Sequence, residues 1–139
     1  MATYIANACA STVQPRTSVD LTSVTSTIAI TVALVASDVV QLVQVPVGAC
    51  IQELIVSVSG SLGSTLTAEF GDGSSTARFI ASGTFGQGAA SLSKLTAATG
   101  NGYVYTVDDT IDMKVNTAAA GTTNATITTT VIYSLQPVL

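Results

Sequence analysis

Histidine and tryptophan are absent from this chain of 139 residues, and charged residues are scarce. Without histidine, the chain lacks the commonest general base and metal-binding side chain, which argues against most hydrolytic chemistry. Charged residues make up 9% of the chain, whereas about 25% is usual for a soluble domain. The net charge is −4, and the basic residues are scattered, so the sequence has no basic patch for nucleic acid. Those basic residues are Arg16, Arg78, Lys94 and Lys114.

Targeting and membrane-spanning patterns are also missing. Met1–Gln14 contains no Lys or Arg and therefore lacks the basic start of a signal peptide. The most apolar run, Ile28–Ala36, is less than half as long as the ~20 residues of a spanning helix. Cys9 and Cys50 have neither CxxC spacing nor a disulfide framework. We expect two small apolar residues, the second one buried, and the sequence leaves open whether they pair.

Alternating apolar residues indicate β-strands along most of the chain. Val, Thr and Ile are frequent, and β-branched residues favour strands. A period of two over four to eight residues is typical of a strand with one buried face. The faces expected to be apolar are Ile28, Ile30, Val32 and Leu34; Gln52, Leu54, Val56 and Val58; Leu66, Ala68 and Phe70; Ile111, Met113 and Val115; and Ile127, Thr129, Val131, Tyr133 and Leu135.

Turn-forming residues separate these runs at intervals of about ten residues, the spacing expected of a β-sandwich. The turns are predicted at Val45–Gly48, Ser59–Ser64, Gly71–Ser75, Thr99–Gly102, Val107–Thr110 and Ala118–Asn124. The sequence thus predicts an all-β fold with eight or nine strands, a single two-sheet β-sandwich that is jelly-roll-like.

Two segments do not follow the strand pattern. Ser82–Thr99 lacks alternation, and we expect a long loop there with one short helix around Ala89–Leu95. Residues 1–18 have no sustained period and contain Pro15, so they are predicted to be an N-terminal arm, followed by the sandwich domain at residues 19–139. Because a disordered tail is usually polar and charged, the apolar arm is expected to be ordered, preferably as a strand added to a neighbouring subunit.

Candidate chemistry is thin. Asp72 lies in a Gly-Asp-Gly turn, and Asp108, Asp109 and Asp112 lie close together. Aspartates of this kind either form turns through their side chains or provide a weak calcium site. The glycine-rich run Gly83–Gly88 lacks the GK[ST] ending of a phosphate-binding loop, and no serine has a histidine or lysine partner to activate it. We predict no enzymatic activity, no cofactor and no metal.

Low charge is the most informative feature of the composition. The outward positions of the predicted strands carry Thr, Ser, Ala and Gln where a monomeric sandwich usually carries Lys, Glu and Asp. Such a surface does little to keep copies apart, and contiguous surface of low polarity commonly marks an interaction site. A sandwich also has edge strands that invite pairing. The composition therefore favours a structural, oligomeric β-protein.

From Asp38 to Leu135 the order of motifs resembles small virion proteins of tailed bacteriophages. An apolar strand leads to Val45-Pro46-Val47-Gly48 and then to Ile51-Gln52-Glu53-Leu54. A Gly71-Asp72 turn with Arg78-Phe79-Ile80, a strand and turn from Tyr105 to Ile111, and a Thr-rich strand ending in Val131-Ile132-Tyr133 follow in that order. Each motif alone is common in β-sandwiches, and residues 1–37 match no known pattern.

This resemblance implies a capsid decoration (cement) protein that binds and stabilises the phage head shell by bridging capsomers. It also implies a virion location on the capsid surface, assembly in the bacterial cytoplasm, and the major capsid protein lattice as partner. A homo-oligomer, with a trimer favoured, is expected; nucleic acid, membrane and small-molecule substrates are not. A receptor-binding or tail-fibre knob is the alternative, and a pilus or cell-surface subunit is a third. The residues expected to contact the oligomer or capsid are Tyr4, Ile5, Val13, Arg16, Arg78, Phe79 and Phe85.

Low charge and period-two strands together predict that the isolated protein forms a stable oligomer. Sedimentation velocity at micromolar concentration should show a species at least twice the 14.0 kDa mass of one chain. A clean monomer over that concentration range would contradict this prediction.

Overall fold

A computed structural model describes residues 1–5, 20–88, 91–121 and 123–136 of the chain. The described part contains nine β-strands. They are β1 (Thr3–Ile5), β2 (Leu21–Ile30), β3 (Val39–Val45), β4 (Ala49–Ser61), β5 (Thr67–Gly71), β6 (Ile80–Gly83), β7 (Ser91–Lys94), β8 (Asp109–Thr117) and β9 (Asn124–Leu135). No helix long and apolar enough to cross a membrane is present among these residues.

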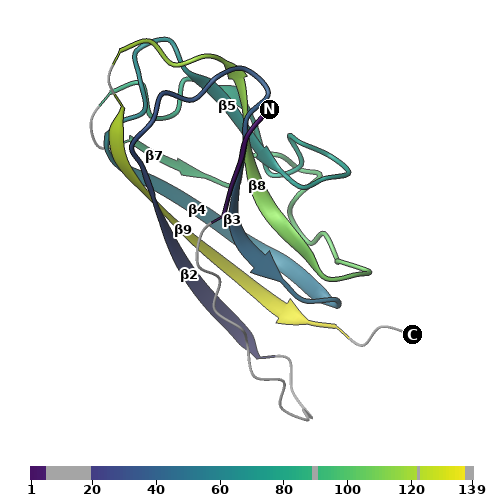
Figure 1. Cartoon of the computed structure of the whole chain (residues 1–139). Coiled ribbons are helices and arrows are strands. Elements are labelled where there is room, and N and C mark those ends of the chain that lie inside the picture. The colour runs from purple at the N-terminus through teal and green to yellow at the C-terminus, as the bar shows by residue number, and fades with distance from the viewer. Residues whose placement is uncertain (6–19, 89–90, 122, 137–139) are drawn as a thin grey trace.

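The strands form two sheets that pack face to face (Figure 1). The five-stranded sheet has the order β1-β3-β8-β5-β6, and the four-stranded sheet has the order β2-β9-β4-β7. All pairs are antiparallel except β1 with β3. The expected all-β, jelly-roll-like sandwich is therefore confirmed.

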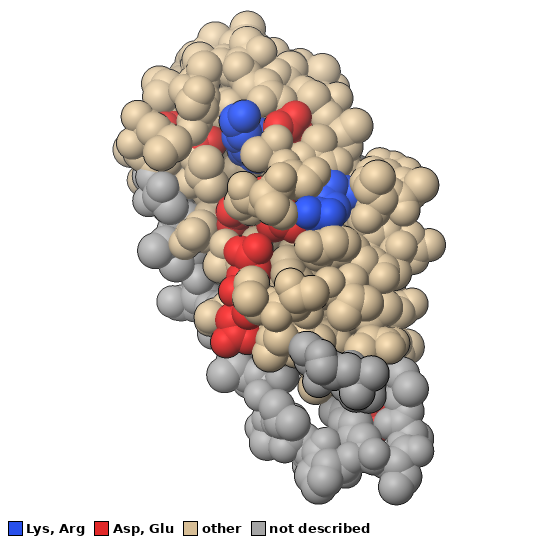
Figure 2. All heavy atoms as spheres, turned by 90° about the vertical axis from the view of Figure 1, so that its right-hand side faces the viewer, with Lys and Arg blue, Asp and Glu red and all other residues tan. Residues whose placement is uncertain are grey.

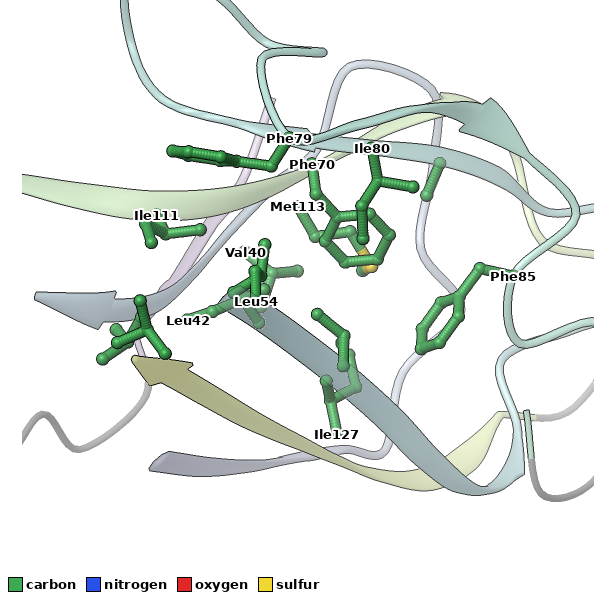
Figure 3. Packing of buried hydrophobic residues seen from close by; sticks show 14 of the residues in the cluster. Val40, Leu42, Leu54, Phe70, Phe79, Ile80, Phe85, Ile111, Met113 and Ile127 are labelled. Carbon is green, nitrogen blue, oxygen red and sulfur yellow. The ribbon is translucent and has the colours of Figure 1, made fainter. Parts of the chain in front are cut away.

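The core lies between the two sheets and is built by the alternation seen in the sequence. Phe70 and Met113 come from the five-stranded sheet, and Leu54 and Ile127 come from the four-stranded sheet; all four are 0% exposed (Figure 3). The predicted inward faces of β5, β8 and β9 are confirmed, including Thr129, which is buried among apolar side chains. Burial of these side chains is the main favourable term for folding, at roughly 25 cal/mol per Å² of apolar surface.

Two register shifts alter the simple alternation of β3 and β4. The pairing of β3 with β8 shifts between Gln41 and Val43, and the pairing of β4 with β9 shifts between Ile51 and Glu53. An extra residue in one strand lets side chains on both sides of the bulge reach the same face. As a result Ile51 and Leu54 are both buried, whereas Gln52, predicted to share the inner face, is exposed.

Two expectations about strand boundaries are wrong. β2 ends at Ile30, and Val32, predicted to share its apolar face, is 47% exposed. The short helix expected around Ala89–Leu95 is replaced, within the described residues, by strand β7, which pairs with Ile55–Val58 of β4. The backbone groups on the side of β4 away from β9 are available for hydrogen bonds. Ser91–Lys94 has a weak local preference, so pairing with these groups makes it a strand.

The first residues of the predicted arm belong to the sandwich of their own chain. Thr3–Ile5 forms β1 and pairs in parallel with Val39–Gln41 of β3. Asp38, which is 1% exposed, fixes this end because its carboxylate accepts hydrogen bonds from the Ala2 and Val35 amides at 2.9 and 3.0 Å. This corrects the expectation of a neighbouring subunit for the backbone of Thr3–Ile5, while residues 6–19 lie outside the described residues.

Replacing Leu54 with alanine tests the importance of the core. We expect Leu54→Ala to lower the free energy of unfolding by about 2–5 kcal/mol, because it removes buried methyl groups and leaves a cavity between the sheets. Val107, which is 63% exposed, is the matched control, and Val107→Ala should change stability by less than about 0.5 kcal/mol. Urea denaturation measures both variants, and equal stability of the two would contradict the assigned core.

Candidate functional site

Charge is distributed unevenly between the two outer faces of the sandwich. Most charged residues of the described part lie on β5 and β8 of the five-stranded sheet or in the loops next to them. Figure 2 shows this side of the molecule, where acidic side chains form a band with basic side chains beside it. The residues with exposed or half-buried side chains on this side are Glu69, Arg78, Asp108, Asp109, Asp112 and Lys114, whereas Asp72 is buried in the loop after β5.

The outer face of the four-stranded sheet is almost uncharged. Threonine and serine occupy neighbouring positions across its strands, as in the row Thr27, Thr128 and Ser57. In the next row, the hydroxyls of Thr25 and Thr130 are 2.9 Å apart, within hydrogen-bond distance. Among the described residues, charge enters this face at Glu53 of β4 and Lys94 of β7. We call this surface the hydroxyl face; its residues are Ser23, Thr25, Thr27, Ile55, Ser57, Ser59, Thr126, Thr128, Thr130 and Ile132.

A buried ion pair lies in the loop that follows β5. The Asp72 carboxylate accepts hydrogen bonds from the amides of Ser74 and Ser75 at 3.0 and 2.8 Å and from Nε of Arg78 at 2.6 Å. Burial alone would raise the pKa of Asp72, but the hydrogen bonds from Arg78, Ser74 and Ser75 lower it below its usual value. Asp72 therefore organises the predicted turn as an ionised carboxylate.

Two tyrosines complete this cluster. The guanidinium of Arg78 lies 3.7 Å from the ring centre of Tyr103, and the Tyr103 and Tyr105 rings pack edge to face at 5.0 Å. The Tyr105 hydroxyl donates to Asp72 at 3.3 Å, and burial together with the Asp72 charge raises the pKa of Tyr105. Backbone hydrogen bonds join Tyr103 and Tyr105 to β4. The cluster therefore connects the β5 loop of one sheet to the edge of the other sheet, and it acts as a structural clamp.

The remaining aspartates have separate partners. Asp108 accepts a hydrogen bond from the Val47 amide at 2.8 Å, and Asp109 accepts one from the Thr110 amide at 2.8 Å. Burial, helped by the charges of Asp109 and Asp72, raises the pKa of Asp112 to about 6, although a side-chain hydrogen bond from Thr110 acts to lower it. Within the described ranges, no three acidic or cysteine side chains lie close enough together to hold a metal ion.

An open depression of about 400 Å³ lies where strands β6 and β7 border the gap between the sheets. Phe70, Ile80 and Phe85 form its apolar floor, and Ser91 and Ser93 of β7 lie at its rim. Its walls carry no charged side chain and no pair of groups suited to acid–base or nucleophilic chemistry. The depression is thus a gap at the edge of the sandwich rather than a catalytic pocket.

The residues predicted to contact partners occupy very different environments. Phe79 is 0% exposed and Phe85 is 8% exposed, so both side chains belong to the core and present little surface to a partner. Arg78 is committed to Asp72, with its side chain 15% exposed. These placements correct the expectation that the two phenylalanines contact a partner, because both side chains pack in the apolar core between the sheets. Tyr4 and Ile5 lie on β1, Val13 and Arg16 lie outside the described residues, and a contact role for the four stays a prediction.

Two features that the fold brings together have no local signal in the sequence. Tyr103 and Tyr105 contact Arg78 and Asp72 across 25 or more residues of sequence. Asp38 follows Ser37, a turn residue with a φ of 74°, and its carboxylate accepts a hydrogen bond from the Ala2 amide, 36 residues away in the sequence. Cys50 is buried, as predicted, and is free, whereas Cys9 lies outside the described residues.

The clamp predicts a graded response to substitution of Arg78. Arg78→Ala should lower the free energy of unfolding by roughly 3 kcal/mol, because it leaves the Asp72 carboxylate buried without its counter-ion. Arg78→Lys should cost less, since it keeps the charge but loses the fork-shaped contact and the stacking on Tyr103. Urea denaturation measures both, with Lys94→Ala, a change at an exposed position of β7, as the control. Equal stability of all three variants would contradict the clamp.

Comparison with known proteins finds similarity at the level of structure. No protein-family model matches this chain, and no curated protein does. A chain of the cyanophage Pam1 capsid asymmetric unit matches with a TM-score of 0.75 and 20% identity over 92% of this chain and 94% of that chain. A chain of the Ralstonia phage GP4 capsid matches with a TM-score of 0.68 and 20% identity, covering 92% and 93% respectively.

A third match has the same fold at lower similarity. A chain of the acidic stable capsid structure of Helicobacter pylori bacteriophage KHP30 matches with a TM-score of 0.58 and 16% identity, over 88% of this chain and 97% of that chain. At these identities the likeness establishes a common fold. The chain thus shares its two-sheet sandwich, over nearly the full length of both partners, with chains found in three phage capsid structures.

Proposed function

We propose that this chain is a non-catalytic structural component of a phage head. The observation that carries the proposal is the mutual coverage of the structural matches, 92% of this chain and 94% of the cyanophage capsid chain. A module shared by unrelated proteins would typically cover only part of one partner. Here the match covers nearly the whole of both chains, which supports a common role for the whole subunit.

The chemistry of the described residues supports a role without catalysis. The buried carboxylate Asp72 is held by Arg78 and by backbone amides, so it serves the turn that contains it. Tyr105 is kept protonated by burial, because its pKa is raised. A nucleophile needs a neighbouring base to activate it, and no histidine is available anywhere in the sequence.

Within the head, the role that fits best is that of a decoration (cement) subunit on the outer capsid surface. A small sandwich with little charge can lie between capsomers and bind the major capsid protein on two sides. Each capsomer is then released only after contacts on both sides are lost, so binding stabilises the assembled shell. Homo-oligomers, with a trimer favoured, would multiply these contacts through symmetry.

The hydroxyl face is the surface best suited to contact the shell. Its outward residues are mainly Thr and Ser, which can be buried against another protein without removing a charge from water. The opposite face carries the acidic band, which costs more to desolvate and is better left in solvent (Figure 2). This orientation places the four-stranded sheet toward the capsid lattice and the five-stranded sheet outward.

A receptor-binding or tail-fibre knob is the alternative role. Such a module would be expected to expose aromatic and polar side chains in loops at one end of the sandwich. Phe85 is 8% exposed, and Tyr105 is 2% exposed, so the loops of the described part offer little aromatic surface. The location on the particle distinguishes the two roles directly.

Electron microscopy of particles made with and without the protein tests the proposed function. We expect added density on the head shell at regular positions and greater resistance of the decorated heads to heat. Density confined to the tail tip would support the knob instead, and particles that carry no added density would overturn both.

A pair of matched substitutions tests the orientation on the shell. Thr128→Lys places one positive charge in the centre of the hydroxyl face, and burying this charge unpaired should weaken shell binding by at least about tenfold. Gln44→Lys places the same charge at an exposed position of β3 in the other sheet and should leave binding unchanged. Occupancy of decorated shells measures both, and equal binding by the two variants would place the contact elsewhere.

A further inference from the structure

Asp112 occupies an unusual position for a carboxylate. It lies on β8, the middle strand of the five-stranded sheet, with Gln41 of β3 and Gly71 of β5 as its register partners. Its Oδ1 atom is shielded from solvent and has no hydrogen-bond partner among the described residues. A shielded carboxylate oxygen without a donor disfavours the charged form of the group.

The groups around Asp112 add negative charge. Asp109 of the same strand and Asp72 of the loop after β5 both act on it electrostatically, and β3 contributes no charged residue. The nearby basic residues lie against other carboxylates. Arg78 is bound to Asp72, and Lys114 lies opposite Glu69 in the ladder. Tyr105 also faces this region through its hydrogen bond to Asp72 and stays neutral.

We propose that Asp112 is a pH-sensitive element of the sandwich, which takes up a proton on mild acidification and thereby removes an unpaired charge from the five-stranded sheet. The protonated carboxyl gains an O–H donor that can be shared with Gln41 or Thr110, and the repulsion from Asp109 and Asp72 ends. The subunit then becomes harder to unfold in mildly acidic solution than at neutral pH.

The direction of the effect follows from proton linkage. Burial raises the pKa of Asp112 to about 6 in the folded chain, above its ordinary value of 3.8. The folded state therefore binds more protons than the unfolded state between these values, and stability falls as the pH rises through about 6. Asp72 and Glu69, whose pKa values are lowered, act in the opposite direction and lose their contribution as the pH falls below their ordinary values of 3.8 and 4.5. Stability should thus be greatest in mildly acidic solution.

Thermal unfolding of the full chain and of Asp112→Asn tests the proposal. For the natural chain we expect the Tm to rise by several degrees between pH 7.5 and pH 5. Asn has nearly the same shape but no charge, so Asp112→Asn should melt higher than the natural chain at pH 7.5 and lose most of the rise. Glu53→Gln, which removes one carboxylate from the other sheet, is the matched control and should keep the rise.

A direct titration separates Asp112 from any other source of pH dependence. The side-chain carboxyl ¹³C signal of Asp112, followed by NMR, should titrate well above the ordinary aspartate range, while the folded spectrum is otherwise retained. The proposal is overturned if this signal titrates near pH 4, or if Asp112→Asn shows the same rise in Tm on acidification as the natural chain.

Discussion

The central ladder of β9 is the constraint on which the rest of this structure depends. β9 pairs with β2 on one side and with β4 on the other, along nearly its whole length. Because successive side chains in a strand point to opposite faces, its register decides at once which residues enter the core and which form the outer surface. Ile127, Val131 and Tyr133 face inward, while Thr126, Thr128 and Thr130 face outward. A slip of one residue would exchange the core for the hydroxyl face.

The same alternation makes the two outer faces different in charge. The four-stranded sheet places Thr and Ser outward, whereas β5 and β8 of the five-stranded sheet place Glu69, Asp112 and Lys114 outward. A subunit with one neutral and one charged face has a preferred way to be buried in an assembly, since desolvating charge is costly. The proposed attachment to a phage shell and the proposed response of Asp112 to pH are therefore consequences of the two faces of one sandwich.

How much of the site could be predicted depends on how far apart the contacting residues lie in the sequence. The turn around Asp72 was predicted because an aspartate between glycines forms its hydrogen bonds within three residues. The partners Tyr103 and Tyr105 were not, because they reach Asp72 and Arg78 across the space between two sheets. Phe79 and Phe85 were predicted as contact residues from their type, and the structure places both in the core. An aromatic residue in an irregular segment gives no indication of whether it points inward.

The all-β class, the inward faces of β5, β8 and β9 and the lack of histidine-based chemistry could be read from the sequence, because period-two patterning and composition are local properties. Four other features depend on the folded structure: the end of β2 at Ile30, the strand at Ser91–Lys94, the pairing of Thr3–Ile5 with β3, and the shielding of Asp112 Oδ1 without a hydrogen-bond partner. Each of these depends on which backbone ladder or side chain lies opposite in space. Segments with weak local preference adopt whatever conformation satisfies that neighbour's hydrogen bonds, and a carboxylate's charge state follows from the donors that happen to surround it.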